Sequence, residues 1–151
     1  MAGIERVSKY CNSFNSLPWH DSKLYSMSIR RSGNGDEVVL RIELASPSGD
    51  EGSSAELIFE NVAFLFCDVD VQGKRQASDD ISEAKCMEES ELKKKIQSER
   101  LKFSPDALKN YLHFNFYLVP PFGSIDILAQ SFRLIRLDAG QRGQPTAGGD
   151  R

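Results

Sequence analysis

The segment LPWHDSKLYSMSIRR, residues 17–31, decides how the rest of the chain is interpreted. It places the chain's only tryptophan beside a histidine and an aspartate, and it then alternates apolar and polar residues in the manner of a β-strand. We predict that His20 and Asp21 anchor the start of this strand through hydrogen bonds to backbone, while Trp19 packs beneath them. The alternating apolar positions, expected on one face of the strand, are Tyr25, Met27 and Ile29.

Alternation continues after the turn sequence SGNGD at 32–36, in which glycine and asparagine favour a tight hairpin. The run 38–44 reads as the antiparallel partner, and a third strand is expected at 55–60. The large apolar residues then change parity at Phe64 and Phe66, which predicts a β-bulge or a sharp bend.

A short helix is expected before this sheet. Its apolar positions recur at spacings of three and four, and the segment 15–18 ends it with a proline. Those positions are Ile4, Val7, Cys11 and Phe14.

The charged segment 73–107 is predicted to be a helical insertion between the third and fourth strands. Asp80 and Glu83 have the spacing of a capping box, and opposite charges four residues apart follow. Leu92 and Ile96 would then face inward.

Two more strands complete the predicted fold. In YLHFNFYLV, residues 111–119, apolar residues occupy one face, and a second parity change follows between Ala129 and Phe132. The sequence therefore predicts an α+β, mainly β, domain over 1–137. In it, an N-terminal helix precedes a strongly bent five-stranded antiparallel sheet, either Sm-like or an open barrel. The apolar-poor segment 138–151 is predicted to be a disordered tail.

Composition narrows the function classes. The chain has 151 residues, a net charge of −3 and three widely spaced cysteines, so neither a disulfide framework nor a paired-cysteine zinc site is indicated. It lacks a run of roughly 20 apolar residues and the apolar core of a signal peptide. We expect a cytoplasmic protein that binds neither DNA nor a membrane.

No catalytic constellation is recognisable. The pair His20–Asp21 lacks the further histidines of a metal-dependent phosphohydrolase, and no serine lies in a G-x-S-x-G turn. DVDVQGKRQASD, at 68–79, partly matches a calcium loop but ends in a short aspartate and follows a strand. The lysines at 93–95 lie between glutamates on either side and favour a solvated helix face. We therefore expect no enzyme activity, no cofactor and no metal site.

One polar strand face has the composition of a binding surface. It combines aromatic rings with hydrogen-bonding groups, which suits a ligand or single-stranded RNA, although a sheet covered by the insertion would present the same residues. The residues of this strand face are Tyr111, His113, Asn115 and Tyr117. Together with the cluster Trp19, His20 and Asp21, they are the candidate ligand-binding positions.

The block WHDSKLYSMSIRR, followed by DEVVLRIEL and AELIFENVAFLF, resembles a loosely defined group of small bacterial proteins of unknown function. Their pattern is a His-Asp-x-x-Leu motif followed by a β-meander, matched here by His20, Asp21, Leu24 and the step Asn61–Val62. Some members are described as immunity-like proteins of bacterial toxin systems. The order of elements is also similar to the Sm-like fold of RNA-binding ring proteins, although the long insertion and the missing I-R-G signature depart from it.

The expected function is therefore a non-enzymatic interaction module in a bacterial cytoplasm, binding a protein partner or self-associating. An Sm-like RNA-binding protein, an immunity protein of a toxin system and, last, a hydrolase centred on His20 and Asp21 are the alternatives.

Overall fold

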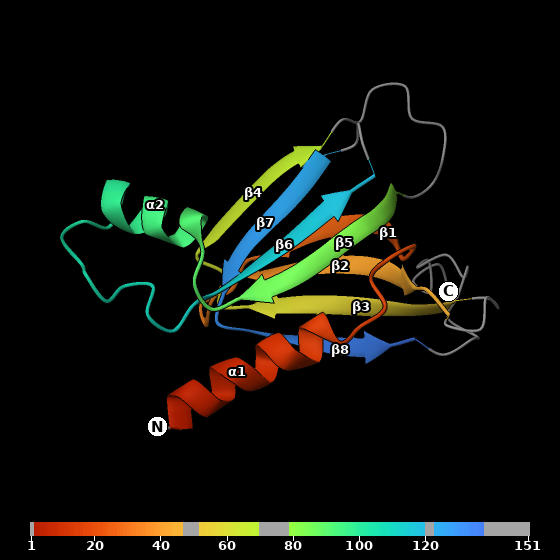
Figure 1. The fold of residues 1–151 in the computed structure, drawn as a ribbon, viewed down its shortest axis with the longest axis horizontal. Coiled ribbons are helices and arrows are strands. Elements are labelled where there is room, and N and C mark those ends of the chain that lie inside the picture. Colours follow the sequence, from red (N-terminus) through yellow and green to blue (C-terminus); the bar gives the residue numbers. More distant parts are fainter. Residues whose placement is uncertain (1, 47–51, 70–78, 120–122, 138–151) are drawn as a thin grey trace.

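The computed structural model describes residues 2–46, 52–69, 79–119 and 123–137 and shows a mostly β protein (Figure 1). The elements in chain order are α1 (Ala2–Asn15), β1 (Lys23–Arg30), β2 (Glu37–Leu44), β3 (Ser53–Glu60), β4 (Phe64–Val69), β5 (Asp79–Met87), α2 (Glu91–Glu99), β6 (Leu112–Leu118), β7 (Gly123–Ala129) and β8 (Ser131–Arg136). The described strands form one antiparallel sheet in the order β4-β7-β6-β5-β1-β2-β3-β8.

This sheet folds over on itself. Strands β1, β2, β3 and β8 form one half and strands β5, β6, β7 and β4 the other, and the described strand pairing between the halves is confined to Lys23 and Leu24 with Asp80 and Asp79. Figure 1 shows the two halves crossing one another. Their inner faces share one apolar core, in which the Phe114 ring of β6 lies 4.8 Å from Phe59 of β3. The arrangement is that of two sheets packed face to face across a crossing angle.

The predicted N-terminal helix is confirmed as α1, and it closes the open side between β5 and β8 (Figure 1). Phe14 near its end is fully buried among aromatic rings from both halves of the sheet. Its ring centroid lies 4.7 Å from Trp19, 5.1 Å from Phe114 and 5.4 Å from Phe132. Phe14 therefore joins the helix to both halves.

The two predicted parity changes fall where the chain passes from one half of the sheet to the other. The first lies between β3 and β4, where Asn61 has a left-handed φ of 52°, and the second lies at Gln130 between β7 and β8. The amide of Gln130 donates to the carbonyl of Glu60 at 3.1 Å, so the two crossings are adjacent. Each parity change therefore marks the point where one strand ends and the next begins.

The predicted five-stranded sheet with a helical insertion at 73–107 is wrong, because the sheet has eight strands and one of them, β5, lies inside that segment. Ile81 and Cys86 of β5 face the core, and a register shift between Ile81 and Glu83 hides the alternation that would have identified a strand. The carboxylate of Asp80 does not cap a helix but accepts a hydrogen bond from Lys23 Nζ at 2.8 Å. The eight strands and their order also show that the predicted Sm-like fold and the predicted open barrel are wrong.

Among the described residues of the predicted insertion, α2 is the helical part. Ser90 caps it by accepting a hydrogen bond from the Lys93 amide at 3.1 Å. Ile96 packs with Leu108 and Leu128 in a second apolar cluster, so α2 covers the outer face of the sheet over β7. The inward position predicted for Ile96 is confirmed.

Several predictions fall outside the described residues. The segment 138–151 and most of the calcium-like pattern at 68–79 lie there, so the disordered tail and the absence of a calcium site remain predictions. A single domain over 1–137 likewise remains a prediction. Within the described ranges, neither helix has the length and apolar character needed to span a membrane.

Candidate functional site

Trp19 is a core residue. It is buried, its Nε1 donates to the carbonyl of Phe14 at 2.8 Å, and its ring centroid lies 5.3 Å from that of Phe116. The only polar atom of the indole is therefore paired with backbone, as predicted for a ring that packs beneath the start of the strand.

His20 and Asp21 lie at the surface, with side chains 81% and 80% exposed. His20 Nδ1 is 3.2 Å from the carbonyl oxygen of Ser82, and the Asp21 amide donates to the carbonyl of Ile81 at 3.1 Å. Both contacts bind the turn before β1 to the backbone of β5. The predicted backbone anchor is confirmed for this doublet. His20 contributes its ring to the anchor, and Asp21 contributes its main-chain amide and adopts a left-handed φ of 69°.

Ser22 is the stronger anchor, and sequence reasoning missed it. The side chain is fully buried; its hydroxyl donates to the carbonyl of Pro18 and accepts from the Ala45 amide at 2.9 Å. Its own carbonyl accepts from the Ile81 amide at 2.7 Å. One serine thus connects the turn, the end of β2 and the start of β5, and nothing in its sequence context distinguishes it from the exposed serines nearby.

The second group of predicted residues lies on β6 and directly before it, and most of it is not on an open face. His113 is buried, with Nε2 2.7 Å from Asp126 Oδ1 and Nδ1 2.8 Å from Ser90 Oγ. Asn115 Nδ2 donates to the same Asp126 oxygen at 2.8 Å. Of the four predicted side chains, Tyr117 alone is exposed, whereas Tyr111 packs against the second apolar cluster.

Ser90, His113 and Asp126 form a continuous hydrogen-bonded chain. Because the ionised Asp126 carboxylate can only accept, His113 Nε2 carries the hydrogen between them, while Nδ1 pairs with the Ser90 hydroxyl, whose oxygen also accepts the Lys93 amide. Burial raises the pKa of Asp126, but hydrogen bonds from His113 and Asn115 outweigh burial and leave that pKa below its usual value. Both ring nitrogens are therefore satisfied, as expected for a buried polar network that holds α2 on the sheet.

Ser90 and Asp126 were not predicted as partners of His113. The sequence did carry a signal for Asp126 as a partner. Strands β6 and β7 are consecutive and antiparallel, and their register places Asn115 opposite Asp126. Ser90 had none, because its position depends on how α2 docks.

The predicted doublet and His113 do not converge. His20 contacts β5 at Ser82, near one end of that strand, whereas His113 pairs with Met87 at the other end. The convergence that a hydrolase centred on His20 and Asp21 would need is absent from the described residues. Nor do any three histidine, cysteine, aspartate or glutamate side chains within them cluster as metal ligands.

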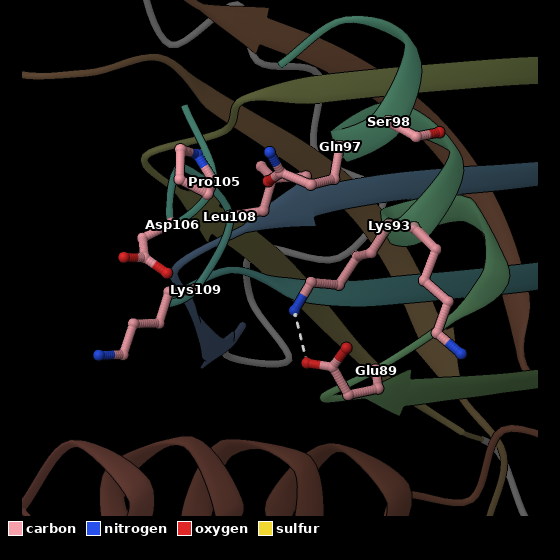
Figure 2. Close-up of a pocket in the computed structure, with 9 residues that line it drawn as sticks. Glu89, Lys93, Gln97, Ser98, Pro105, Asp106, Leu108 and Lys109 are labelled. Atoms are coloured by element: carbon pink, nitrogen blue, oxygen red, sulfur yellow. Dashed lines mark hydrogen bonds and ion pairs between the residues drawn. The ribbon is translucent and has the colours of Figure 1, made fainter. Parts of the chain in front are cut away.

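A cavity of about 390 Å³ lies between α2 and the segment that follows it (Figure 2). Gln97 Nε2 donates to the carbonyls of Leu101 and Ser104 and so joins the two walls. Lys93 is buried, and its Nζ donates to the carbonyl of Glu88 at 2.6 Å and lies 3.4 Å from Glu89 Oε1. Figure 2 shows Lys93 directed at Glu89. The buried ammonium group of Lys93 in the cavity wall therefore already has an acidic partner.

Strand β1 presents the clearest unpaired surface among the described residues. Among the described strands, its β5 side is paired at Lys23 and Leu24 alone, so the edge from Ser26 to Arg30 meets no described strand. Met27 and Ile29 lie opposite the core residues Leu40 and Val38, yet they are 36% and 54% exposed.

The predicted common face of Tyr25, Met27 and Ile29 is wrong in one respect. A register shift between Leu24 and Ser26 places Tyr25 in an irregularity of the strand, where its hydroxyl donates to Glu43 at 3.3 Å. Met27 and Ile29 keep the inner side of the sheet.

Comparison with known proteins assigns no family. No family model matches the sequence, and no curated protein or solved structure matches it. The argument for function therefore depends on the geometry of the chain itself.

Proposed function

We propose that this chain is a protein-binding module that receives an extended segment of a partner along the free edge of β1. The observation that carries the proposal is the edge from Ser26 to Arg30, which has no described partner strand and exposes Met27 and Ile29. An unpaired edge offers a row of backbone donors and acceptors on which another strand can pair.

The outer strands β4 and β8 are weaker candidates. Among the described residues, β4 has no large apolar side chain that is strongly exposed, and β8 has only Ile135. On β1 the exposed apolar groups lie beside the unpaired backbone, so a docked strand would gain both hydrogen bonds and apolar contact.

Charge indicates the chemistry of the partner. The segment 22–31 contains Lys23, Arg30 and Arg31 and no acidic residue, although the chain as a whole is acidic. Their carboxylate neighbours form exposed ion pairs, which contribute about 0–1 kcal/mol each, and the Arg31 side chain remains 82% exposed. An extended segment with acidic residues at its ends complements this edge.

A second copy of the chain fits the edge less well. Antiparallel pairing of two β1 strands about Met27 would place Lys23 of one copy opposite Arg31 of the other. Like charges directly opposite one another are destabilising. We therefore propose a different, acidic protein as the partner, and an immunity protein bound to its toxin would be one such module.

RNA binding is not part of the proposal. His113 and Asn115 hydrogen-bond to Asp126, and Tyr111 packs against the second apolar cluster, which leaves Tyr117 alone of the predicted face open to stacking. Retention of oligo-U on a filter at two salt concentrations tests that alternative directly.

The test uses a fluorescent nonapeptide in which valine alternates with threonine between terminal glutamates, and fluorescence anisotropy measures its binding. We expect Ile29→Asp to weaken binding at least about tenfold, since it removes apolar contact and repels the acidic ends. Ile135→Asp makes the same change on the exposed isoleucine of β8 and should leave binding unchanged. Equal losses for the two variants, or no binding by the unaltered protein, would contradict the proposal.

A further inference from the structure

Two cysteines meet where α1 packs against β5. Cys11 on α1 and Cys86 on β5 are 8% and 4% exposed, and their sulfur atoms are 2.9 Å apart. They are separated by 75 positions in sequence, so the fold alone brings them together. A disulfide bond needs a separation of about 2.05 Å, so less than about 1 Å of movement would allow it to form.

The backbone beside the two thiols is firmly held. Asn15, one helical turn after Cys11, donates from Nδ2 to the carbonyl of Cys86 at 3.1 Å. The Cys86 amide donates in return to Asn15 Oδ1 at 2.8 Å. This pair of hydrogen bonds fixes the helix against the strand at the cysteine itself and keeps the two sulfur atoms close.

A small molecule can approach the pair. Both cysteines line a cavity of about 510 Å³, whose other walls are Asn12, Met87, Glu88 and Glu89. A low-molecular-weight disulfide entering this cavity meets a sulfur atom without prior unfolding of the helix.

We propose that Cys11 and Cys86 are a site of reversible thiol oxidation whose product is a disulfide bond between α1 and β5. The oxidant is a low-molecular-weight disulfide. This modification is separate from the binding proposed for β1 and does not depend on it.

The reaction is a pair of thiol–disulfide exchanges. The Cys11 thiolate, belonging to the more exposed of the two residues, attacks one sulfur of the reagent, forms a mixed disulfide and releases the first reagent thiol. The Cys86 thiolate then attacks the Cys11 sulfur and releases the second. Two electrons pass from the cysteines to the reagent, and the two cysteine protons end on the released thiols.

The order and the rate follow from burial. Burial raises the pKa of Cys11, despite the contact with Cys86, and burial together with that contact raises the pKa of Cys86 further. Both groups are therefore mostly protonated thiols at neutral pH, and the rate of oxidation should rise with pH.

The third cysteine supplies a matched control. Cys67 lies on β4, where it is exposed. The test therefore uses the Cys67→Ser protein, which retains only the two proposed partners, incubated reduced and folded with oxidised glutathione at pH 7 and pH 9.

We expect the loss of both titratable thiols, a mass lower by two hydrogen atoms and a faster reaction at pH 9. The temperature of unfolding should rise by about 5–10 °C and return on reduction. Adding Cys11→Ser should stop the reaction at a glutathione adduct on Cys86 or prevent it.

Proteolytic mapping of the unaltered protein gives a readout that does not depend on any variant folding. A peptide linking Cys11 to Cys86 supports the proposal. Two thiols that stay titratable at both pH values, or a link that forms only above the unfolding temperature, would overturn it.

Discussion

Replacing Phe14 with alanine is expected to lower the free energy of unfolding by about 4 kcal/mol. Phe14 is fully buried, and its ring contacts rings from both halves of the sheet. Burying a phenylalanine removes about 150–250 Å² from water, which at about 25 cal/mol per Å² amounts to about 4–6 kcal/mol. Alanine keeps a small part of that burial, and measured substitutions of buried aromatic residues by alanine cost about 3–5 kcal/mol.

Urea denaturation followed by tryptophan fluorescence measures the change. With a dependence of about 2 kcal/mol per molar urea, the midpoint should fall by about 2 M. Phe103→Ala is the matched control, because Phe103 is 89% exposed, and its midpoint should change by less than about 0.3 M.

A loss below about 1 kcal/mol for Phe14→Ala, or a loss equal to that of the control, would refute the docking of α1 between the two halves. Folded Phe14→Ala protein with an unchanged midpoint would show that the helix contributes little to the core.

Three further predictions concern buried or partly buried polar groups. Because the pKa of Asp126 is lower in the folded state, its contribution to stability is present above the unfolded pKa of about 3.9 and is lost as the pH falls through the folded value. Asp126→Asn should therefore flatten the loss of stability between about pH 5 and about pH 2, measured by urea midpoints at each pH. Ser22→Ala should cost about 2–4 kcal/mol, because it leaves the Ala45 amide and a carbonyl unpaired, as equilibrium denaturation would show. Ser90→Ala should cost about 2 kcal/mol by the same measurement, because α2 loses its cap and His113 loses a partner.

Ser26→Ala is a control for both serine variants, since Ser26 is exposed on β1 and should change stability by less than about 0.5 kcal/mol. Losses no larger than that of this control would contradict the roles given to Ser22 and Ser90. An Asp126→Asn protein with the same acid sensitivity as the unaltered chain would contradict the network around His113.

Local alternation predicted most of the strands. The runs at 38–44 and 55–60 each carry an uninterrupted apolar face and form β2 and β3. The same reasoning failed for β5, where the register shift after Ile81 interrupts the period and the charged residues around it fit a helix equally well. A single irregular position was enough to change the number of strands.

The candidate sites were harder to predict than the strands. Sequence reasoning selected His113 by residue type, but its partners come from β7 and from the cap of α2. The exposure of Met27 and Ile29 depends on where β5 separates from β1, which alternation along one strand does not reveal. Such features arise from the arrangement of elements distant in sequence.

The position of Phe14 has a consequence for synthesis on the ribosome. Its ring neighbours include Phe114 and Phe132, so a growing chain cannot complete the burial of α1 until β6 and then β8 have been made. Contacts between such remote segments slow folding, since a long stretch of chain must be ordered before they form. During translation the amphipathic helix remains available to chaperones, and β8 completes its burial.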